Sequence, residues 1–150
     1  MPTTKRVLVV DDDREIRELL TSVLRRRDLV VDVAVDGAEA LDLLRQNTYS
    51  VVLLDLLMPN TDGFGVLNEL DSALAPPIVL VITGAERALV KRLDPQRIHC
   101  VVRKPFDADD LASLVLACAD IKSRRGFETM AISAIVASGP LLAWLNRFGG

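Results

Sequence analysis

Short runs of apolar residues alternate along the chain with segments whose apolar positions recur at helical spacing. The apolar runs predict five strands, at Val7–Val10, Val30–Val35, Val51–Leu54, Ile78–Ile82 and His99–Val102. The spacing i, i+3, i+4, i+7 and related patterns predict five helices, around Ile16–Leu24, Ala38–Leu44, Phe64–Leu70, Glu86–Leu93 and Leu111–Cys118.

The order of these elements indicates the fold class. A strand precedes each helix, and several strands are wholly apolar, which is typical of a parallel sheet covered by helices on both faces. We therefore predict an α/β fold with a doubly wound five-stranded parallel sheet and five helices. Asp13 and Asp107 are the expected N-caps of the first and last helices.

Composition limits the possible functions. Half of the residues are hydrophobic, which excludes a disordered chain, and only 4% are aromatic, so the core is expected to consist of Val, Leu, Ile and Ala. A net charge of −3 argues against nucleic-acid binding over a whole face. Cys100 and Cys118 suit neither a disulfide framework nor a metal site, so we expect buried thiols and a cytoplasmic location. The apolar run before Asp11 is too short for a signal peptide.

Polar residues follow four of the predicted strands. In an open parallel sheet, ligands bind at the carboxyl ends of the strands, so these residues are expected to converge. They are Asp11, Asp12 and Asp13 after the first strand, Asp55 after the third, Thr83 after the fourth, and Lys104 with Pro105 after the fifth.

This set of side chains favours one kind of chemistry. Crowded carboxylates repel one another unless a cation joins them, and oxygen ligands suit Mg²⁺. A carboxylate such as Asp55 can act as a nucleophile toward phosphorus and form an aspartyl phosphate. The metal ion, the Lys104 ammonium group and the Thr83 hydroxyl would neutralise the phosphoryl oxygens. Taken singly, each group also fits an ordinary turn or helix cap, so the prediction depends on their conjunction.

Over residues 4–122 the sequence resembles the receiver domain of bacterial two-component response regulators, which has a flavodoxin-like fold. The motif Asp-x-x-Met-Pro-x-x-Asp-Gly begins at Asp55, and Lys-Pro-Phe begins at Lys104. The matching stretches are Val7–Asp13, Val33–Leu41, Val51–Gly63, Val79–Gly84 and Arg103–Phe106.

The resemblance implies a role for individual positions. Asp55 would be the phosphoacceptor, receiving a phosphoryl group from a sensor histidine kinase or a phosphotransfer protein. Asp12 would ligate Mg²⁺ directly, Asp11 mainly through water, and the backbone carbonyl of Leu57 would be a further ligand. The protein would not be an independent turnover enzyme.

Three further positions have implied roles in the response to phosphorylation. Thr83 would hydrogen-bond the phosphoryl group and move on activation, and Lys104 would pair with a phosphoryl oxygen. The peptide bond before Pro105 would be cis, as it often is in this family.

The sequence departs from the family pattern at three places. The aromatic switch residue that usually lies three positions before the lysine is Val101 here, which puts the usual coupling between threonine and ring in doubt. The segment 91–99 contains charges and a proline, so the fourth helix should be short or irregular. Leu57 and Ala85 are apolar where polar residues can position a hydrolytic water, so the phosphorylated form should hydrolyse slowly.

The last 28 residues differ in composition from the rest of the chain. Residues 1–122 carry 15 basic and 20 acidic side chains, whereas 123–150 carry three arginines and one glutamate, so we divide the chain into a receiver domain and an apolar tail. Gly139-Pro140 would interrupt a helix, which favours two short helices, about 127–138 and 140–148, over a membrane span. Self-packing or homodimer contact ranks first for the tail, partner docking second and contact with a membrane surface third.

The tail is too short for a DNA-binding output domain with its own core, so no direct DNA contact is expected. The leading hypothesis is a phosphorylation-switched module that signals through protein contacts with an output protein. The alternatives are a phosphorelay intermediate or phosphate sink, a constitutive interaction module, and a phosphatase. The intact acidic, threonine and lysine set argues against the constitutive module, and the lack of an acid–base residue argues against the phosphatase.

Overall fold

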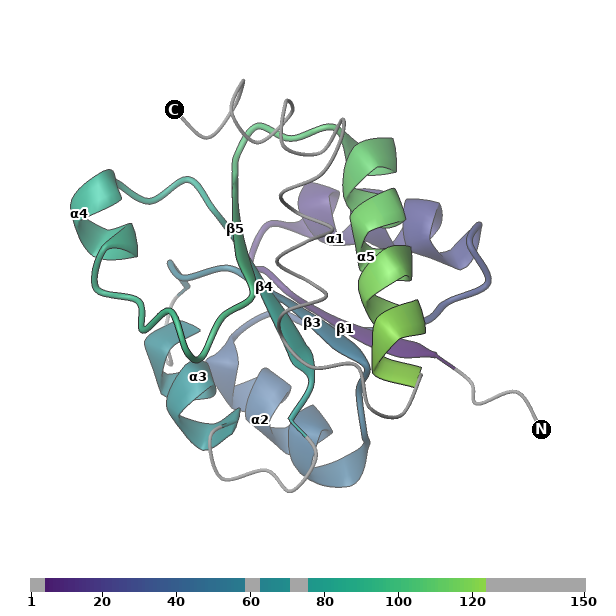
Figure 1. Ribbon diagram of the computed structural model, residues 1–150, viewed down its shortest axis with the longest axis horizontal. Helices are drawn as coiled ribbons and strands as arrows, with labels where there is room; N and C mark the ends of the chain where they lie inside the picture. Colours follow the sequence, from purple (N-terminus) through teal and green to yellow (C-terminus); the bar gives the residue numbers. More distant parts are fainter. Residues whose placement is uncertain (1–4, 59–62, 71–75, 124–150) are drawn as a thin grey trace.

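A single parallel sheet lies between two layers of helices, in a computed structural model that describes residues 5–58, 63–70 and 76–123 (Figure 1). The strands are arranged in the order β2-β1-β3-β4-β5, and each neighbouring pair is parallel. The predicted doubly wound α/β fold is confirmed. The elements are β1 (Arg6–Val10), α1 (Arg14–Arg25), β2 (Val30–Ala34), α2 (Gly37–Gln46), β3 (Val51–Leu54), α3 (Gly63–Leu70), β4 (Ile78–Thr83), α4 (Arg87–Val90), β5 (Cys100–Arg103) and α5 (Ala108–Ser123).

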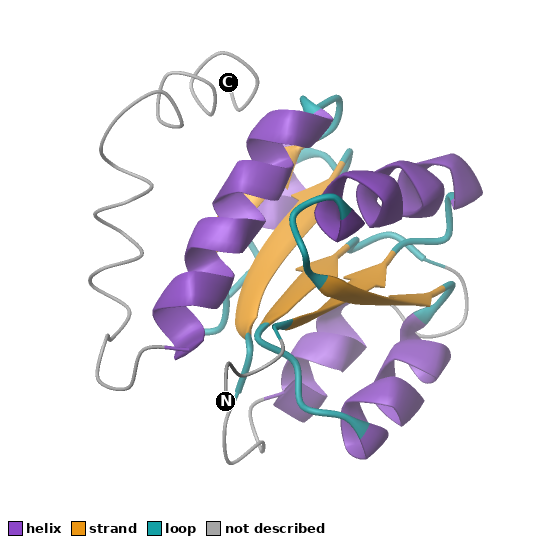
Figure 2. Ribbon diagram, turned by 90° about the vertical axis from the view of Figure 1, so that its right-hand side faces the viewer, coloured by secondary structure: helices purple, strands orange, loops and turns teal. Residues whose placement is uncertain are grey.

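The sheet divides the core into two halves, as the view along it in Figure 2 shows. Helices α1 and α5 pack on one face, and α2 and α3 pack on the other. Successive residues of β1 alternate between the halves: Val7 and Val9 contact the first, Leu8 and Val10 the second. Because both faces are covered, a strand needs apolar residues at every position, which explains the unbroken apolar runs.

Aspartate side chains cap three of the helices. The Asp13 carboxylate accepts hydrogen bonds from the backbone N–H groups of Glu15 and Ile16, and Asp36 caps α2 in the same way. The Asp107 carboxylate accepts from the N–H of Asp110 at 2.9 Å, at the start of α5. Both predicted caps are therefore confirmed. They satisfy backbone donors that have no partner within the helix.

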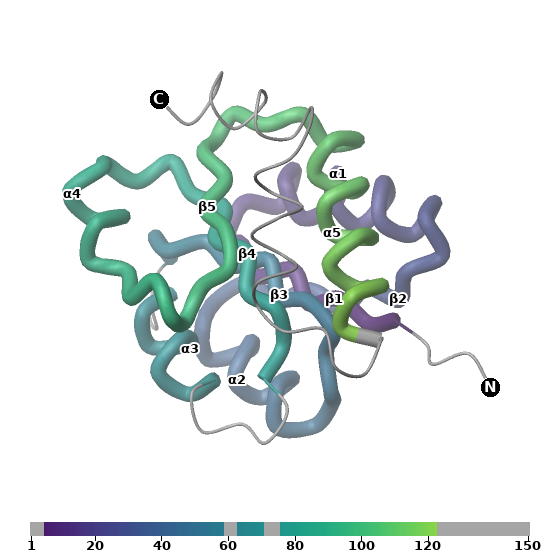
Figure 3. The backbone as a smooth tube through the Cα atoms, in the orientation of Figure 1, coloured from purple at the N-terminus to yellow at the C-terminus, as the bar shows by residue number. Residues whose placement is uncertain are grey.

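The region between β4 and β5 differs from the prediction. Helix α4 covers only Arg87–Val90, and none of its residues is fully buried, although Val90 packs against the core half on the α2 and α3 side. Little packing therefore supports this helix, in keeping with its single turn. The predicted span Glu86–Leu93 was too long, whereas the prediction of a short or irregular fourth helix is confirmed by its short length. The tube in Figure 3 shows the chain returning from α4 to the edge strand β5.

His99 lies immediately before β5 rather than inside it. Its backbone N–H donates to the Val79 carbonyl at 2.9 Å, and its ring Nδ1 accepts from the Val79 N–H at 3.0 Å. The His99 ring therefore accepts the hydrogen bond from the Val79 N–H that a backbone carbonyl would otherwise accept, just before the pairing of β4 and β5 begins. This arrangement requires a neutral ring, because a protonated Nδ1 cannot accept a hydrogen bond.

We expect stability to fall as the pH drops below about 6.5, the ordinary pKa of histidine. Burial lowers the pKa of His99, with a further contribution from the positive charge of Lys122. The unfolded chain then binds a proton that the folded chain rejects, so protonation favours unfolding. Urea unfolding at a series of pH values should show a smaller decline for His99→Gln, whose amide oxygen accepts the same bond but does not titrate. An identical decline in both proteins would contradict this assignment.

Both cysteines are free and buried, as predicted, and burial raises the pKa of each thiol. Within the described ranges, no helix is long and apolar enough to cross a membrane. The two short helices predicted for the tail lie outside the described residues.

Candidate functional site

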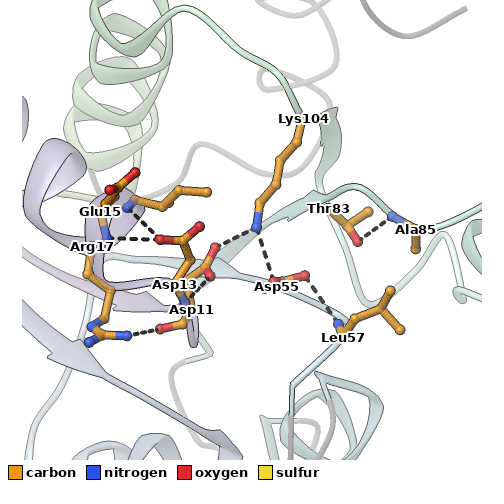
Figure 4. A network of polar contacts seen from close by, with 10 residues as sticks. Asp11, Asp13, Glu15, Arg17, Asp55, Leu57, Thr83, Ala85 and Lys104 are labelled. Carbon is orange, nitrogen blue, oxygen red and sulfur yellow. Dashed lines mark hydrogen bonds and ion pairs between the residues drawn. The ribbon is translucent and has the colours of Figure 1, made fainter.

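Four strand ends meet at one edge of the sheet and bring the predicted side chains together (Figure 4). Asp11 follows β1, Asp55 follows β3, Thr83 ends β4 and Lys104 follows β5. The Lys104 Nζ atom lies 2.8 Å from Asp11 Oδ2 and 3.1 Å from Asp55 Oδ2. The two carboxylates lie 44 positions apart in the sequence, but they are neighbours in space because β3 pairs directly with β1. One ammonium group therefore contacts both.

The site is largely withdrawn from solvent. Asp11, Asp55 and Thr83 are 3%, 5% and 0% exposed, whereas Asp12 is exposed. Burial raises the pKa of Asp11 above its usual value, although the hydrogen bond from Lys104 opposes this shift. Burial by itself disfavours the Lys104 cation, but the hydrogen bond to Asp11 and the charges of both carboxylates outweigh it and raise the pKa of the lysine. The charged lysine therefore compensates the buried carboxylates.

Backbone contacts fix the position of Asp55. Its N–H donates to the Val10 carbonyl at 2.9 Å, continuing the pairing of β1 and β3 beyond the end of the strand. Its Oδ1 atom accepts from the Leu57 N–H at 3.2 Å, which brings the Leu57 peptide to the site. The N–H of Gly63, at the start of α3, donates to the Leu56 carbonyl at 3.2 Å. These bonds place the Asp55 side chain at the sheet edge with its Oδ2 atom directed to Lys104.

The chain after β4 is also held by specific bonds. The Thr83 Oγ1 atom accepts from the Ala85 N–H at 3.0 Å, and the Thr83 carbonyl accepts from the Lys104 N–H at 3.1 Å. The Arg103 guanidinium donates to the Ala85 carbonyl at 3.0 Å. Thr83 thus lies beside the Lys104 backbone, although its hydroxyl oxygen is engaged by its own loop.

The carboxylates of Asp11, Asp12 and Asp55 form a group suited to a hard divalent cation. One oxygen from each lies within 4.8 Å of the others. Three oxygen donors with an open, exposed side at Asp12 fit Mg²⁺, which prefers a few carboxylates and keeps several waters. A pocket of about 420 Å³, lined in part by Asp12, Leu57 and Met58, opens beside this group and gives access from solvent.

A protein-family model described as the response regulator receiver domain matches residues 7–116. The chain belongs to this family. The match runs from the second residue of β1 through β5 and reaches into α5, so it covers every side chain of the site just described.

Curated relatives of this receiver domain include larger proteins. The probable transcriptional regulator ycf27 of Guillardia theta is 33% identical over 116 residues, which are 69% of this chain and 46% of the relative. The response regulator MprA of Mycobacterium sp. (strain KMS) is 43% identical over 81 residues, which are 54% of this chain and 35% of the relative. The chain spans about half or less of the length of these relatives.

Two solved structures illustrate the similarity of fold. The response regulator TrrA of Thermotoga maritima, in complex with Mg²⁺ and BeF, is 32% identical with a TM-score of 0.68, and the match covers 77% of this chain and 99% of that chain. A CheY-like receiver domain protein of Methanospirillum hungatei JF-1 has a TM-score of 0.76 at 21% identity, covering 83% of this chain and 100% of that chain. This second likeness supports the fold alone.

The structure brings together Asp11, Asp12, Asp55, Thr83 and Lys104, the residues predicted to meet. Other predicted features have a definite place as well. The peptide bond before Pro105 is cis. Val101 is half-buried on β5 and packs against the core half on the α2 and α3 side. The motif residues Pro59 to Asp62 lie outside the described residues.

Two residues of the site region were not singled out from the sequence. Gly63 was quoted only as the last residue of the motif that begins at Asp55, yet it packs directly against the Asp55 and Leu56 backbone. Arg103 was quoted only as the neighbour of Lys104. Its position one residue before Lys104, and two after Val101 on an edge strand, was a signal that it faces the same side as Val101.

Proposed function

We propose that this receiver domain accepts a phosphoryl group on Asp55 from a sensor histidine kinase or a phosphotransfer protein, and then signals through contacts with another protein. The observation that carries the proposal is the Lys104 ammonium bridge between Asp11 and Asp55, beside a cluster of three carboxylates. Such a site holds a nucleophile, a cation and metal ligands within one hydrogen-bonded group.

The transfer requires an in-line attack on the phosphorus atom. An Asp55 carboxylate oxygen forms the new P–O bond while the P–N bond of a phosphohistidine breaks, and the leaving imidazole nitrogen keeps the electron pair and is protonated. The Leu57 N–H bond to Oδ1 orients the carboxylate, so that the reacting group is positioned before the donor arrives.

Charge neutralisation is the second requirement. Asp11, Asp12 and Asp55 would hold Mg²⁺, with the Leu57 carbonyl as a further ligand, and the ion would supply positive charge to the phosphoryl oxygens. Lys104 would move its hydrogen bond from the Asp55 carboxylate to a phosphoryl oxygen, as its flexible side chain permits. The Thr83 hydroxyl would donate to another phosphoryl oxygen after leaving its bond with the Ala85 N–H.

A second function is favoured by one specific observation. Val101 stands at the position of the aromatic switch residue, and a valine side chain packed on the core cannot alternate between two positions as a ring does. This favours a phosphorelay intermediate or phosphate sink, in which transfer of the phosphoryl group is itself the function. In neither case do we assign independent turnover to this chain.

Phosphorylation with acetyl phosphate and Mg²⁺ tests the proposal. Intact mass should show one added phosphoryl group in the wild type and none in Asp55→Asn, which keeps the shape of the side chain but removes its nucleophilic charge. A change in size-exclusion elution on labelling would support a signalling switch, and an unchanged elution would favour the relay. Failure of the wild type to become labelled by any donor would overturn the phosphoacceptor assignment.

We expect the aspartyl phosphate to hydrolyse slowly. Leu57 is 54% exposed beside the site, and Ala85 is 2% exposed in the loop after β4, so neither position offers a polar group to orient water. Decay of the label should therefore extend well beyond seconds, and Leu57→Asn should accelerate it by about tenfold by positioning water. The control Leu57→Met preserves the apolar surface and should decay like the wild type. A half-life of seconds in the purified wild type would contradict the prediction.

A further inference from the structure

Arg103 connects the edge strand β5 to the loop that follows β4. It pairs with Thr83 in the register of the two strands, and its guanidinium donates to the Ala85 carbonyl at 3.0 Å. The contact reaches over the end of β4 to a residue two positions after Thr83. It therefore joins the site to β5 by a side chain, in addition to the backbone ladder.

The bond partner of Arg103 is itself coupled to the Thr83 hydroxyl. The N–H of Ala85 donates to Thr83 Oγ1 at 3.0 Å, so a single residue receives Arg103 at its carbonyl and holds Thr83 at its amide. Ala85 is only 2% exposed, and a buried carbonyl that loses its donor is not compensated by water. The position of this loop, and of the Thr83 hydroxyl, therefore depends on the guanidinium.

Arg103 lies on the same face of β5 as Val101, the position of the aromatic switch residue in the family. Side chains two residues apart on a strand lie on the same face, so Arg103 shares a face with Val101, where the aromatic residue of other receiver domains is absent. The contact between β5 and the β4–α4 loop is made here by a guanidinium two residues further along the strand. A charged donor gives a directed bond to one carbonyl, which a valine cannot provide.

We propose that Arg103 is a positioning residue that latches the loop after β4 in its unphosphorylated position. The latch consists of the Arg103–Ala85 and Ala85–Thr83 hydrogen bonds. It rests on the proposed function, because its effect is to oppose the movement of Thr83 toward a phosphoryl group on Asp55. The strength of the Arg103–Ala85 bond therefore influences how strongly the site favours the phosphorylated conformation. When the loop moves, the Arg103 guanidinium on the β5 face loses this bond and becomes available to another acceptor.

Binding of beryllium fluoride in the presence of Mg²⁺ tests the latch, because its tetrahedral adduct with a carboxylate imitates a phosphoryl group. Arg103→Met keeps most of the apolar stem and removes the donors. Its apparent affinity for beryllium fluoride should rise about fivefold, the effect of losing one hydrogen bond that holds only the unliganded state. Its affinity for Mg²⁺ alone, measured by amide NMR titration, should match the wild type, since Arg103 does not contact the carboxylates.

Two further variants separate the latch from a structural role. Arg103→Lys retains a cationic donor and should return the beryllium fluoride affinity toward the wild-type value. Arg27→Met removes the guanidinium of another half-buried arginine. This group donates to Ser113 Oγ at 3.0 Å, away from the site, and its loss should change neither affinity. If Arg103→Met does not fold, Arg103→Leu, which also lacks a donor, replaces it, and an increase in affinity is again expected.

The outcomes are distinct. An unchanged or weaker beryllium fluoride affinity in Arg103→Met would overturn the latch, as would equal effects of the methionine and lysine variants. Failure of the wild type to bind beryllium fluoride and to accept a phosphoryl group would overturn the proposed function, and the latch with it. Normal binding by the wild type with no response to residue 103 would leave the proposed function standing and remove the latch alone.

Discussion

Replacing Lys104 by methionine lowers the free energy of unfolding by about 2–4 kcal/mol in metal-free buffer at neutral pH, somewhat less than the cost of breaking a fully buried ion pair. The side chains of Asp11 and Asp55 are only 4% and 6% exposed, and both accept a hydrogen bond from this one ammonium group. Without it, two buried carboxylates repel each other and lose a hydrogen bond each. The lysine side chain itself is 22% exposed, which reduces the effect.

The dependence of this loss on pH and on Mg²⁺ identifies its cause. Burial already raises the pKa of Asp11, and removal of the opposing lysine raises it further. A folded-state pKa above the unfolded value means that the folded chain binds more protons, so the variant regains stability as the pH falls through that folded value. Mg²⁺ should also restore stability, because an ion that binds only the folded carboxylate cluster stabilises it by mass action.

Urea unfolding of Lys104→Met, with and without Mg²⁺, measures both effects. The matched control is Lys5→Met, which removes the more exposed ion pair between Lys5 and Asp120. Pairs of that kind contribute about 1 kcal/mol or less, and this one lies away from the carboxylate cluster, so no response to Mg²⁺ is expected. Equal losses in the two variants, or a loss in Lys104→Met that Mg²⁺ does not reduce, would contradict the electrostatic account.

The sheet and the meeting of the site residues were predictable from the sequence because each follows from local pattern and a general topological rule. The alternation of Val7–Val10 between two core halves requires an unbroken apolar run, and the run is visible in the sequence. Once the strands are parallel, their carboxyl ends share an edge, so Asp55 and Lys104 must approach each other despite their separation. The alternation of strands and helices, together with the rule that the carboxyl ends of parallel strands lie at one edge of the sheet, was enough to predict the sheet and the position of the site.

Contacts that depend on side-chain reach were not predictable in the same way. The imidazole of His99 substitutes for a strand partner of Val79, which no periodicity reveals. The Arg103 bond to Ala85 depends on the register of β4 and β5 and on the course of a loop. Helix α4 covers only Arg87–Val90 and has no fully buried residue, although Val90 packs against the core half on the α2 and α3 side, and helical spacing alone does not reveal where such a helix ends. The division at residue 122, the tail helices and the roles of the site residues stay predictions.

Gly63→Ala tests the close backbone approach between α3 and the peptide of Asp55. A Cβ atom at Gly63 would lie 2.6 Å from the Asp55 carbonyl oxygen and 2.8 Å from the Leu56 Cα atom. Both are backbone atoms next to the end of β3, where the Asp55 N–H is bonded to the Val10 carbonyl, so the start of α3 is expected to move away and to disturb the 3.2 Å bond from the Gly63 N–H to the Leu56 carbonyl. Overpacking of this kind costs about 1–3 kcal/mol of unfolding free energy.

The same displacement reaches the site, because the strained atom belongs to the peptide of Asp55 itself. Gly63→Ala should therefore weaken Mg²⁺ binding as well as stability, which urea unfolding and amide NMR titration measure on the same sample. Gly84→Ala is the matched control: it lies one residue after Thr83, and an added Cβ meets nothing within 4 Å. Its stability should stay within about 0.5 kcal/mol of the wild type. A Gly63→Ala protein that is as stable as Gly84→Ala and binds Mg²⁺ normally would show that the backbone of α3 yields without moving Asp55, and that the glycine is not needed to place this carboxylate.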